Sequence, residues 1–212
     1  MLGYRRADML SALHGLGRFI VLTRTSSELR GPVFAFADGG WRISDSMVAF
    51  PYADDYSFAI LQSALHTAWF REKCTTLETR LTYTARTVGG HFPWPQNPDP
   101  SAVAAVAEAA AAIIEHRALA FGLGTTLAAQ YDVLRRPGRS TLRQLHQRLD
   151  QAVLDVYGFD SAGDLLGQLL ALNHDVAQRE RHKEPVTRPG LPPGQPIGSL
   201  SVSSWRFPRP TL

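Results

Sequence analysis

A glutamate and an arginine stand two positions apart in LETRLTYTARTVGGHFPWP, the stretch that covers residues 77–95. Side chains two apart on an extended segment project from the same face, so Glu78 and Arg80 would present an acceptor beside a donor. Such a pair suits a partner whose own hydrogen-bonding groups come as one donor set and one acceptor set. The alternative is a solvated ion pair on an edge strand, which contributes little to stability.

The common catalytic motifs are missing from this sequence. It contains no Gly-x-Ser-x-Gly elbow, no Gly-x-x-x-x-Gly-Lys phosphate loop and no His-Glu-x-x-His pair for zinc. Cys74 is the sole cysteine, which excludes an internal disulfide and a multi-cysteine metal site. Helix capping explains the adjacent carboxylates Asp54 and Asp55. We therefore expect no catalytic residue, metal ligand or bound cofactor, and no autonomous enzyme activity.

Composition indicates a folded, water-soluble protein with a modest positive charge. Of the 212 residues, 44% are apolar and 19% are charged, which suits one sizeable domain or two small ones. The formal net charge of +3 does not by itself predict strong attraction to nucleic acid. Among the Lys and Arg residues, all except Lys73 and Lys183 are arginines. An arginine guanidinium can donate two parallel hydrogen bonds to a guanine edge or a phosphate, which a lysine cannot. No run approaches membrane-spanning length, so we expect no membrane partner and a cytoplasmic location.

The first half of the chain reads as strands followed by a helix. Segments 18–25, 32–38 and 46–53 are rich in β-branched and aromatic residues and are separated by turn sequences. Asp54 or Asp55 is expected to cap one helix over 56–74, and residues 79–87 have extended character. Two glycines and four prolines over residues 89–100 then predict a boundary between structural units.

The second half reads as helices. Four are expected, over residues 101–120, 125–136, 140–158 and 164–183, with Ser101 and Ser140 as N-caps and Gly158 as a stop. From Pro185 onward the chain is rich in proline and glycine and carries too little apolar surface to fold. The predicted fold class is α+β: a small β-containing unit (1–95, strands plus one helix), a mainly α-helical bundle domain (96–184) and a disordered tail (185–212).

Four blocks in a particular order carry a resemblance to a known family. DDYSFAILQSALHTAW, LETRLTYTARTVGGHFPWP, LRQLHQRLDQAVLDVYGF and LLALN follow one another as in the C-terminal part of type IIL (MmeI-like) restriction–modification proteins. Those are large adenine-specific DNA methyltransferases, many with a fused endonuclease. The resemblance runs from about Arg18 to about Asn173. It implies that residues 1–95 are part of a target recognition domain and that 96–184 form the family's C-terminal helical domain.

The resemblance also implies what this chain would need from elsewhere. The family's cofactor glycines and its Asn/Asp-Pro-Pro-Tyr motif are missing, since the only Pro-Pro is Pro192-Pro193. S-adenosylmethionine is the cofactor of the full-length family, whereas this chain would hold none. We expect a truncated or split chain whose partners are double-stranded DNA and a methyltransferase catalytic domain or subunit. The alternative is a protein-interaction or regulatory subunit that docks on a separately encoded methyltransferase.

Within the resemblance, Glu78 and Arg80 match the position that sets one base of the target. A carboxylate accepts from the cytosine amino group and a guanidinium donates twice to guanine, so this pair can read one C·G base pair. Tyr83 and Arg86 would lie beside it and contact backbone phosphates. FPWP (residues 92–95) is expected to be structural and to pack the recognition unit onto the helical one.

Overall fold

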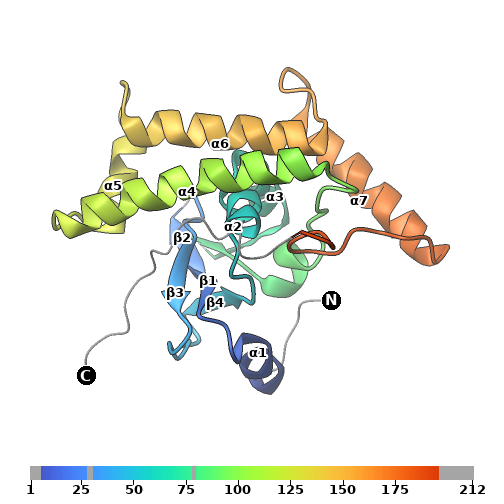
Figure 1. Cartoon of the computed structure of the whole chain (residues 1–212), viewed down its shortest axis with the longest axis horizontal. Coiled ribbons are helices and arrows are strands. Elements are labelled where there is room, and N and C mark those ends of the chain that lie inside the picture. Colours follow the sequence, from blue (N-terminus) through green and yellow to red (C-terminus); the bar gives the residue numbers. More distant parts are fainter. Residues whose placement is uncertain (1–5, 28–30, 78–79, 196–212) are drawn as a thin grey trace.

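The computed structural model describes residues 6–27, 31–77 and 80–195, and it confirms the α+β class. Two small antiparallel sheets lie beneath a layer of helices (Figure 1). The elements are α1 (Arg6–Leu13), β1 (Arg18–Thr23), β2 (Thr25–Ser27), β3 (Ala35–Asp38), β4 (Met47–Phe50), α2 (Asp55–Gln62), α3 (Ala64–Lys73), β5 (Thr75–Leu77), β6 (Arg80–Thr82), the π-helical turn η1 (Ala85–Gly89), α4 (Pro100–Gly122), α5 (Leu127–Asp132), the 3-10 turn η2 (Val133–Arg135), α6 (Thr141–Tyr157) and α7 (Leu165–Arg181).

The first sheet has the order β3-β1-β4, and its central strand is covered on both faces. Ile20 and Leu22 point into the main core, whereas Phe19 and Val21 point into a smaller core that also contains Leu13 of α1. This double burial explains why β1 reads as a continuous apolar run rather than as an alternating one. The sequence did not predict α1, which closes the smaller core.

The helix expected over residues 56–74 is two helices, so that prediction is wrong at Ser63. Ser63 is extended, with a ψ of 158°, and its hydroxyl accepts from the His66 N–H at 3.1 Å. The same hydroxyl donates to the carbonyl of Ile60 at 2.8 Å. One side chain therefore ends α2 and begins α3. Asp54 caps α2, as one of the two alternatives predicted, by accepting from the Ser57 N–H at 2.7 Å.

Helices α4 and α6 run side by side along the top of the molecule, and α7 continues from the end of α6 (Figure 1). The N-cap of α4 is Asp99, with Pro100 in the first turn, so the prediction of Ser101 is wrong. Ser101 instead donates its hydroxyl to Asp99 at 2.6 Å. The caps predicted for α6 are confirmed: Ser140 accepts from the Arg143 N–H, and Gly158 adopts a φ of 66°.

The main core draws side chains from both sides of residue 96. Helix α4 packs against α2 on one side and against α6 on the other. Phe58 of α2, Ile113 of α4 and Leu149 of α6 are all fully buried in this one cluster. The β-containing and helical parts therefore share apolar packing over a wide area.

The chain after α7 folds back onto the body, which corrects the prediction of a disordered tail for residues 185–195. Leu191 packs against the main core, and the Thr187 N–H donates to Gln96 Oε1 at 2.9 Å. Gly190 has a φ of +106° and lies so close to Tyr52 that a Cβ there would be 2.9 Å from the ring. The tail prediction for residues 196–212 falls outside the described residues.

Deleting residues 185–212 should therefore destabilise the protein by about 1–3 kcal/mol, because it removes partly buried apolar surface and three hydrogen bonds to Gln96 and Asn97. Urea unfolding measures the change in free energy. A chain shortened only by residues 196–212 is the matched control. Equal stability of both shortened chains and the full chain would show that the docked segment contributes nothing.

Candidate nucleic-acid interface

The second sheet, with the order β2-β6-β5, carries the proposed base-reading position. Arg80 begins β6, where its backbone pairs with Ser27 of β2 and Leu77 of β5. Only residues 78 and 79 lie between β5 and β6 along the chain. Glu78 and the side chain of Arg80 fall outside what the structure describes, so their same-face arrangement stays a prediction.

Strand β6 is anchored to the core through its alternate positions. Leu81 is buried, and Tyr83, directly after the strand, is 1% exposed. The Tyr83 hydroxyl lies 3.0 Å from His66 Nε2, and its ring stacks on Phe70 at 5.4 Å. Burial raises the pKa of Tyr83 well above its usual value and lowers the pKa of His66 to about 3, so both groups are neutral. The predicted phosphate contact of Tyr83 is wrong, because this side chain faces the core.

The extended segment predicted over residues 79–87 ends at Thr84, which still has an extended backbone. Residues 85–89 form the π-helical turn η1, whose Val88 carbonyl accepts from the Trp69 indole N–H at 3.0 Å. Gly89 fits closely here, because a Cβ at this position would lie 3.3 Å from the Tyr83 hydroxyl. The turn is therefore held against α3, and Arg86 remains exposed on its outer side.

Two exposed arginines border a hollow of about 430 Å³ beside β6, and the sequence predicted only one of them. Arg86 lines it from η1 and Arg24 from the junction of β1 with β2. The Arg24 N–H donates to the Ser46 carbonyl, and its own carbonyl accepts from the Tyr83 N–H, both at 2.8 Å. Arg24 is thus tied to both sheets by its backbone. Its place inside a strand-like run, RFIVLTRT, concealed this exposed position.

The FPWP segment has the structural role that the sequence predicted. The Phe92 ring meets the His66 ring edge-on at 4.7 Å, and the Trp94 ring lies 5.5 Å from that of Tyr52. From the helical side, the Tyr157 hydroxyl donates to the Pro93 carbonyl at 2.8 Å. Asn173 donates to the His91 carbonyl at 2.7 Å. These contacts join the sheet region to α6 and α7.

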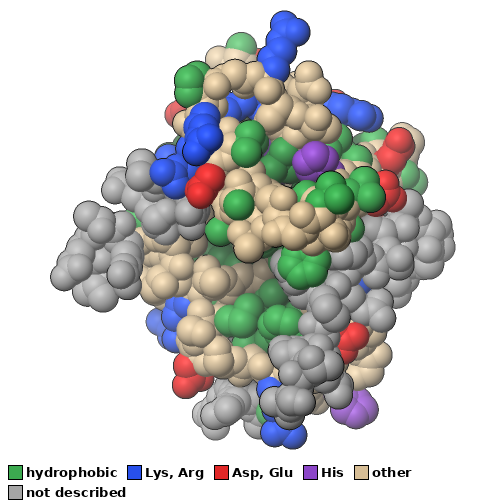
Figure 2. Space-filling view, turned by 90° about the vertical axis from the view of Figure 1, so that its left-hand side faces the viewer, with side chains coloured by type: hydrophobic (Ala, Val, Ile, Leu, Met, Phe, Trp, Pro, Cys, Tyr) green, Lys and Arg blue, Asp and Glu red, His purple; other side chains and the backbone are tan. Residues whose placement is uncertain are grey.

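The face that carries α5 and β2 is hollowed near its middle (Figure 2). Hydrophobic side chains are visible in the depth of this face, and Lys and Arg side chains gather toward its upper part, over the helices. A smaller cavity of about 270 Å³ is lined by Thr23, Thr25 and Ser26 from the strands and by Leu127 and Tyr131 from α5. The surface beside β2 therefore offers hydroxyl groups next to an apolar floor.

Other kinds of site find little support in the described part of the chain. Across residues 6–27, 31–77 and 80–195, no three His, Cys, Asp or Glu side chains gather in a way that could hold a metal ion. None of the helices in these same ranges has the length and apolarity needed to cross a membrane.

Comparison with known proteins shows a similarity that includes both sheets. Residues 10–96 match the family model described as "MmeI, target recognition domain". A solved structure of the type IIL restriction–modification enzyme MmeI in complex with DNA is similar at 32% sequence identity and a TM-score of 0.68. The similarity covers 76% of this chain and 21% of that one, so this chain spans about a fifth of that enzyme's length. No curated protein matches.

Proposed function

We propose, from the premise that residues 10–96 of this chain form a target recognition domain of the MmeI type, that the protein recognises a specific sequence in double-stranded DNA. The observation that carries this proposal is the extent of the match, which includes both sheets and η1. The similar enzyme is described in complex with DNA. The similarity extends beyond the recognition domain, since it covers 76% of the chain.

Base readout would be centred on Glu78 and Arg80. Glu78 would accept from a cytosine amino group while Arg80 donates to the N7 and O6 atoms of the paired guanine. A rigid support favours such readout, because donors must be held close to their productive positions. Strand β6 has this support: Leu81 is buried, and the Tyr83 that follows it is bonded to His66.

Phosphate contacts would come from the hollow beside β6. Arg86 is exposed there, as the sequence prediction requires, and Arg24 joins it. Contacts to phosphates position a protein on the duplex without reading sequence. These two arginines would therefore set the register in which β6 meets the base edges.

The chemistry of the wider enzyme would be supplied by another part. We propose that the catalytic partner is an adenine-specific DNA methyltransferase, encoded separately or as a further segment, which binds S-adenosylmethionine. This chain would direct it to the target as its recognition module, and the pair would act in restriction–modification against phage DNA. The comparisons give no particular support to the alternative of a purely regulatory subunit.

Selection from a pool of random duplexes tests the recognition role. The full chain, alone and together with a methyltransferase domain of this family, should enrich one short sequence over several rounds. A pool of random single strands is the control, since recognition through the major groove requires a duplex. Enrichment of no common sequence in either arrangement would refute the proposal.

Isolated from any partner, the chain should transfer no methyl group to DNA. The reason is the lack of the Asn/Asp-Pro-Pro-Tyr motif and of cofactor glycines in its sequence. Incorporation of a radiolabelled methyl group into duplex DNA is the measurement, with a protein-free reaction as the background. S-adenosylmethionine should also leave the melting temperature unchanged, because a ligand stabilises only a protein that binds it. Methylation above background would overturn this prediction.

A further inference from the structure

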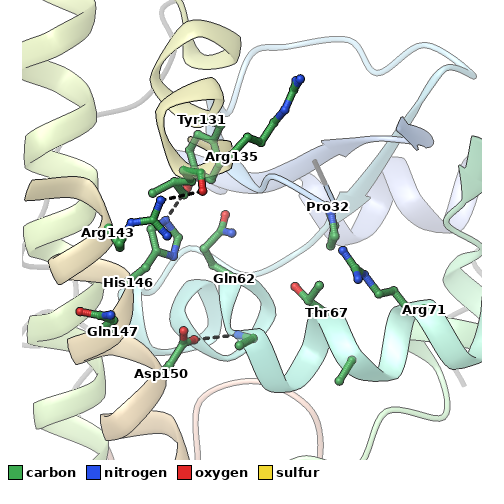
Figure 3. A pocket seen from close by; sticks show the side chains of 13 residues that line it. Pro32, Gln62, Thr67, Arg71, Tyr131, Arg135, Arg143, His146, Gln147 and Asp150 are labelled. Atoms are coloured by element: carbon green, nitrogen blue, oxygen red, sulfur yellow. Dashed lines mark hydrogen bonds between the residues drawn. The ribbon is translucent and has the colours of Figure 1, made fainter. Parts of the chain in front are cut away.

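A polar cleft of about 630 Å³ opens between α3 on one side and α5, η2 and α6 on the other (Figure 3). It lies outside the strands that carry the proposed base readout. Thr67 and Arg71 line it from α3, His146 and Gln147 from α6, and Arg135 and Arg143 from the two segments that meet opposite α3. In Figure 3, Arg71 extends from α3 toward Pro32, and Arg143 and His146 lie close to Tyr131.

Arg143 is the arginine of this cleft whose hydrogen-bond acceptors are neutral carbonyl groups. Arg143 donates to the carbonyls of Leu134 at 2.8 Å and Arg136 at 2.7 Å, and its buried Nε–H has no acceptor. Arg135 makes an exposed ion pair with Asp132 at 3.0 Å. Carbonyl partners orient a guanidinium but leave its charge uncompensated. The Arg143 charge is therefore available to an anion in the cleft.

A further cation lies directly behind the cleft wall. Arg117 is 2% exposed and donates to the Phe34 carbonyl at 2.7 Å and to Gln62 Oε1 at 2.9 Å. It also donates to the Tyr131 hydroxyl. These partners are neutral, and burial lowers the Arg117 pKa to about 9, which indicates an unfavourable buried charge. Gln62 and Tyr131 both line the cleft, so an anion there would lie one side chain away from Arg117.

Negative charge in the cleft is limited to one described side chain. Asp150 is the single carboxylate among the described lining residues, and its Oδ1 accepts from the Ala64 N–H at 2.7 Å. Burial raises the Asp150 pKa to about 6, so part of its population is neutral near that pH. Arg143 and Arg117, whose hydrogen-bond acceptors are neutral, therefore outweigh this one carboxylate. Gln147 and His146 add neutral hydrogen-bonding groups of the kind that complete a phosphate site, whereas the Thr67 hydroxyl already donates to the Ser63 carbonyl.

We propose that this cleft binds a phosphate group, carried either by the DNA backbone beside the target or by a small free phosphate. Only the first source rests on the proposed recognition of DNA. DNA bound at residues 78 and 80 would lie near Arg71, because Arg71 is in the last turn of α3, which ends at Lys73, and β5 begins at Thr75. The cleft therefore adjoins the segment that leads to the proposed base-reading residues. A phosphate would compensate the charges of Arg143 and Arg117 and complete the polar lining.

Two isosteric substitutions on one helix test the site. Gln147 and Gln144 are both exposed on α6, but only Gln147 lines the cleft. Gln147→Glu places a negative charge in the cleft, and Gln144→Glu adds the same charge to the same helix outside it. Inorganic phosphate, compared with chloride at equal ionic strength, should raise the melting temperature of the full chain and of Gln144→Glu. Gln147→Glu should bind phosphate roughly tenfold more weakly.

A second measurement separates the two sources. If the phosphate belongs to DNA, Gln147→Glu should also weaken binding to a labelled duplex. The slope of the logarithm of the binding constant against the logarithm of the salt concentration should fall in magnitude by about one, the value for one lost phosphate contact. Unchanged duplex binding, with the phosphate effect lost, would assign the site to a small free phosphate. A chain that binds no duplex would refute the recognition role alone. Equal phosphate responses of Gln147→Glu and Gln144→Glu would overturn the proposal of this site.

Discussion

The double substitution Glu78→Lys with Arg80→Asp should change the preferred base pair at one target position from C·G to G·C. The exchange reverses donor and acceptor: lysine would donate to guanine where cytosine stood, and aspartate would accept from the opposite cytosine. The rest of the target should be unchanged, because the other contacts remain. Each single substitution should weaken binding by about 1–3 kcal/mol, since it leaves one base edge unmatched.

Selection from random duplexes with the wild type, both single variants and the double variant provides the measurement. Arg24→Lys is a useful control, because it changes a proposed phosphate contact and should weaken all sequences alike. If the double variant retains the wild-type base at every position, Glu78 and Arg80 do not read that pair. They would then be the surface ion pair that the sequence left open.

Acidification from pH 7.5 to pH 5 should lower the free energy of unfolding by about 2–3 kcal/mol in total. Burial lowers the pKa of His66 and of His146 to about 3, below the value of about 6.5 in an unfolded chain. The unfolded state therefore binds more protons below pH 6.5, and stability present above that pH is lost as pH falls toward 3. Each histidine contributes about 1.4 kcal/mol per pH unit over this window.

Asp150 acts in the opposite direction and reduces the net loss. Its pKa is raised to about 6, above that of an unfolded aspartate, so its protonation favours the folded state as pH falls below 6. Urea unfolding at the two pH values measures the sum. His66→Phe should lose less stability on acidification than the wild type, whereas His174→Phe, on the exposed face of α7, should behave like the wild type. Identical pH dependence in all three proteins would show that burial of His66 does not couple folding to protons.

Local sequence signals predicted those parts of the fold that depend on local chemistry. The α+β class, the three strands of the first sheet and the caps at Ser140 and Gly158 follow from apolar patterns and from hydrogen bonds within a few residues. The structural role of FPWP was predictable too, because aromatic rings flanked by prolines suit rigid packing. The Tyr157 and Asn173 hydrogen bonds to this segment bear that out.

The differences arise where one side chain has competing partners or where packing is distant in sequence. Ser63 divides the predicted helix because its hydroxyl both ends α2 and caps α3. Asp99 takes the cap expected of Ser101, because Pro100 suits the first helical turn. Residues 185–195 are ordered by Gln96 and Tyr52, some ninety residues or more away, which a proline-rich composition could not reveal.

The candidate site was predictable to the extent that short motifs define it. Arg86 was predicted to lie beside Glu78 and Arg80 within the family resemblance, and it is exposed. The prediction for Tyr83 is wrong, because the sequence of a strand does not show whether a tyrosine hydroxyl faces DNA or a buried histidine. Arg24 was missed, since its exposure depends on the junction of two sheets. The cleft proposed to bind phosphate is lined from the loop at Pro32 and from α2, α3, α5, η2 and α6, which meet only in the folded chain.

The ratio of two dissociation constants tests sequence-specific recognition most directly. The full chain, with its methyltransferase partner if selection required one, is titrated at a single salt concentration with the selected duplex and with a shuffled duplex of the same composition. The selected duplex should bind at least about 10³-fold more tightly, which is the lower end of the range for specific DNA-binding proteins. A ratio near one would mean that any binding is electrostatic only, and it would contradict the assignment of this chain to target recognition.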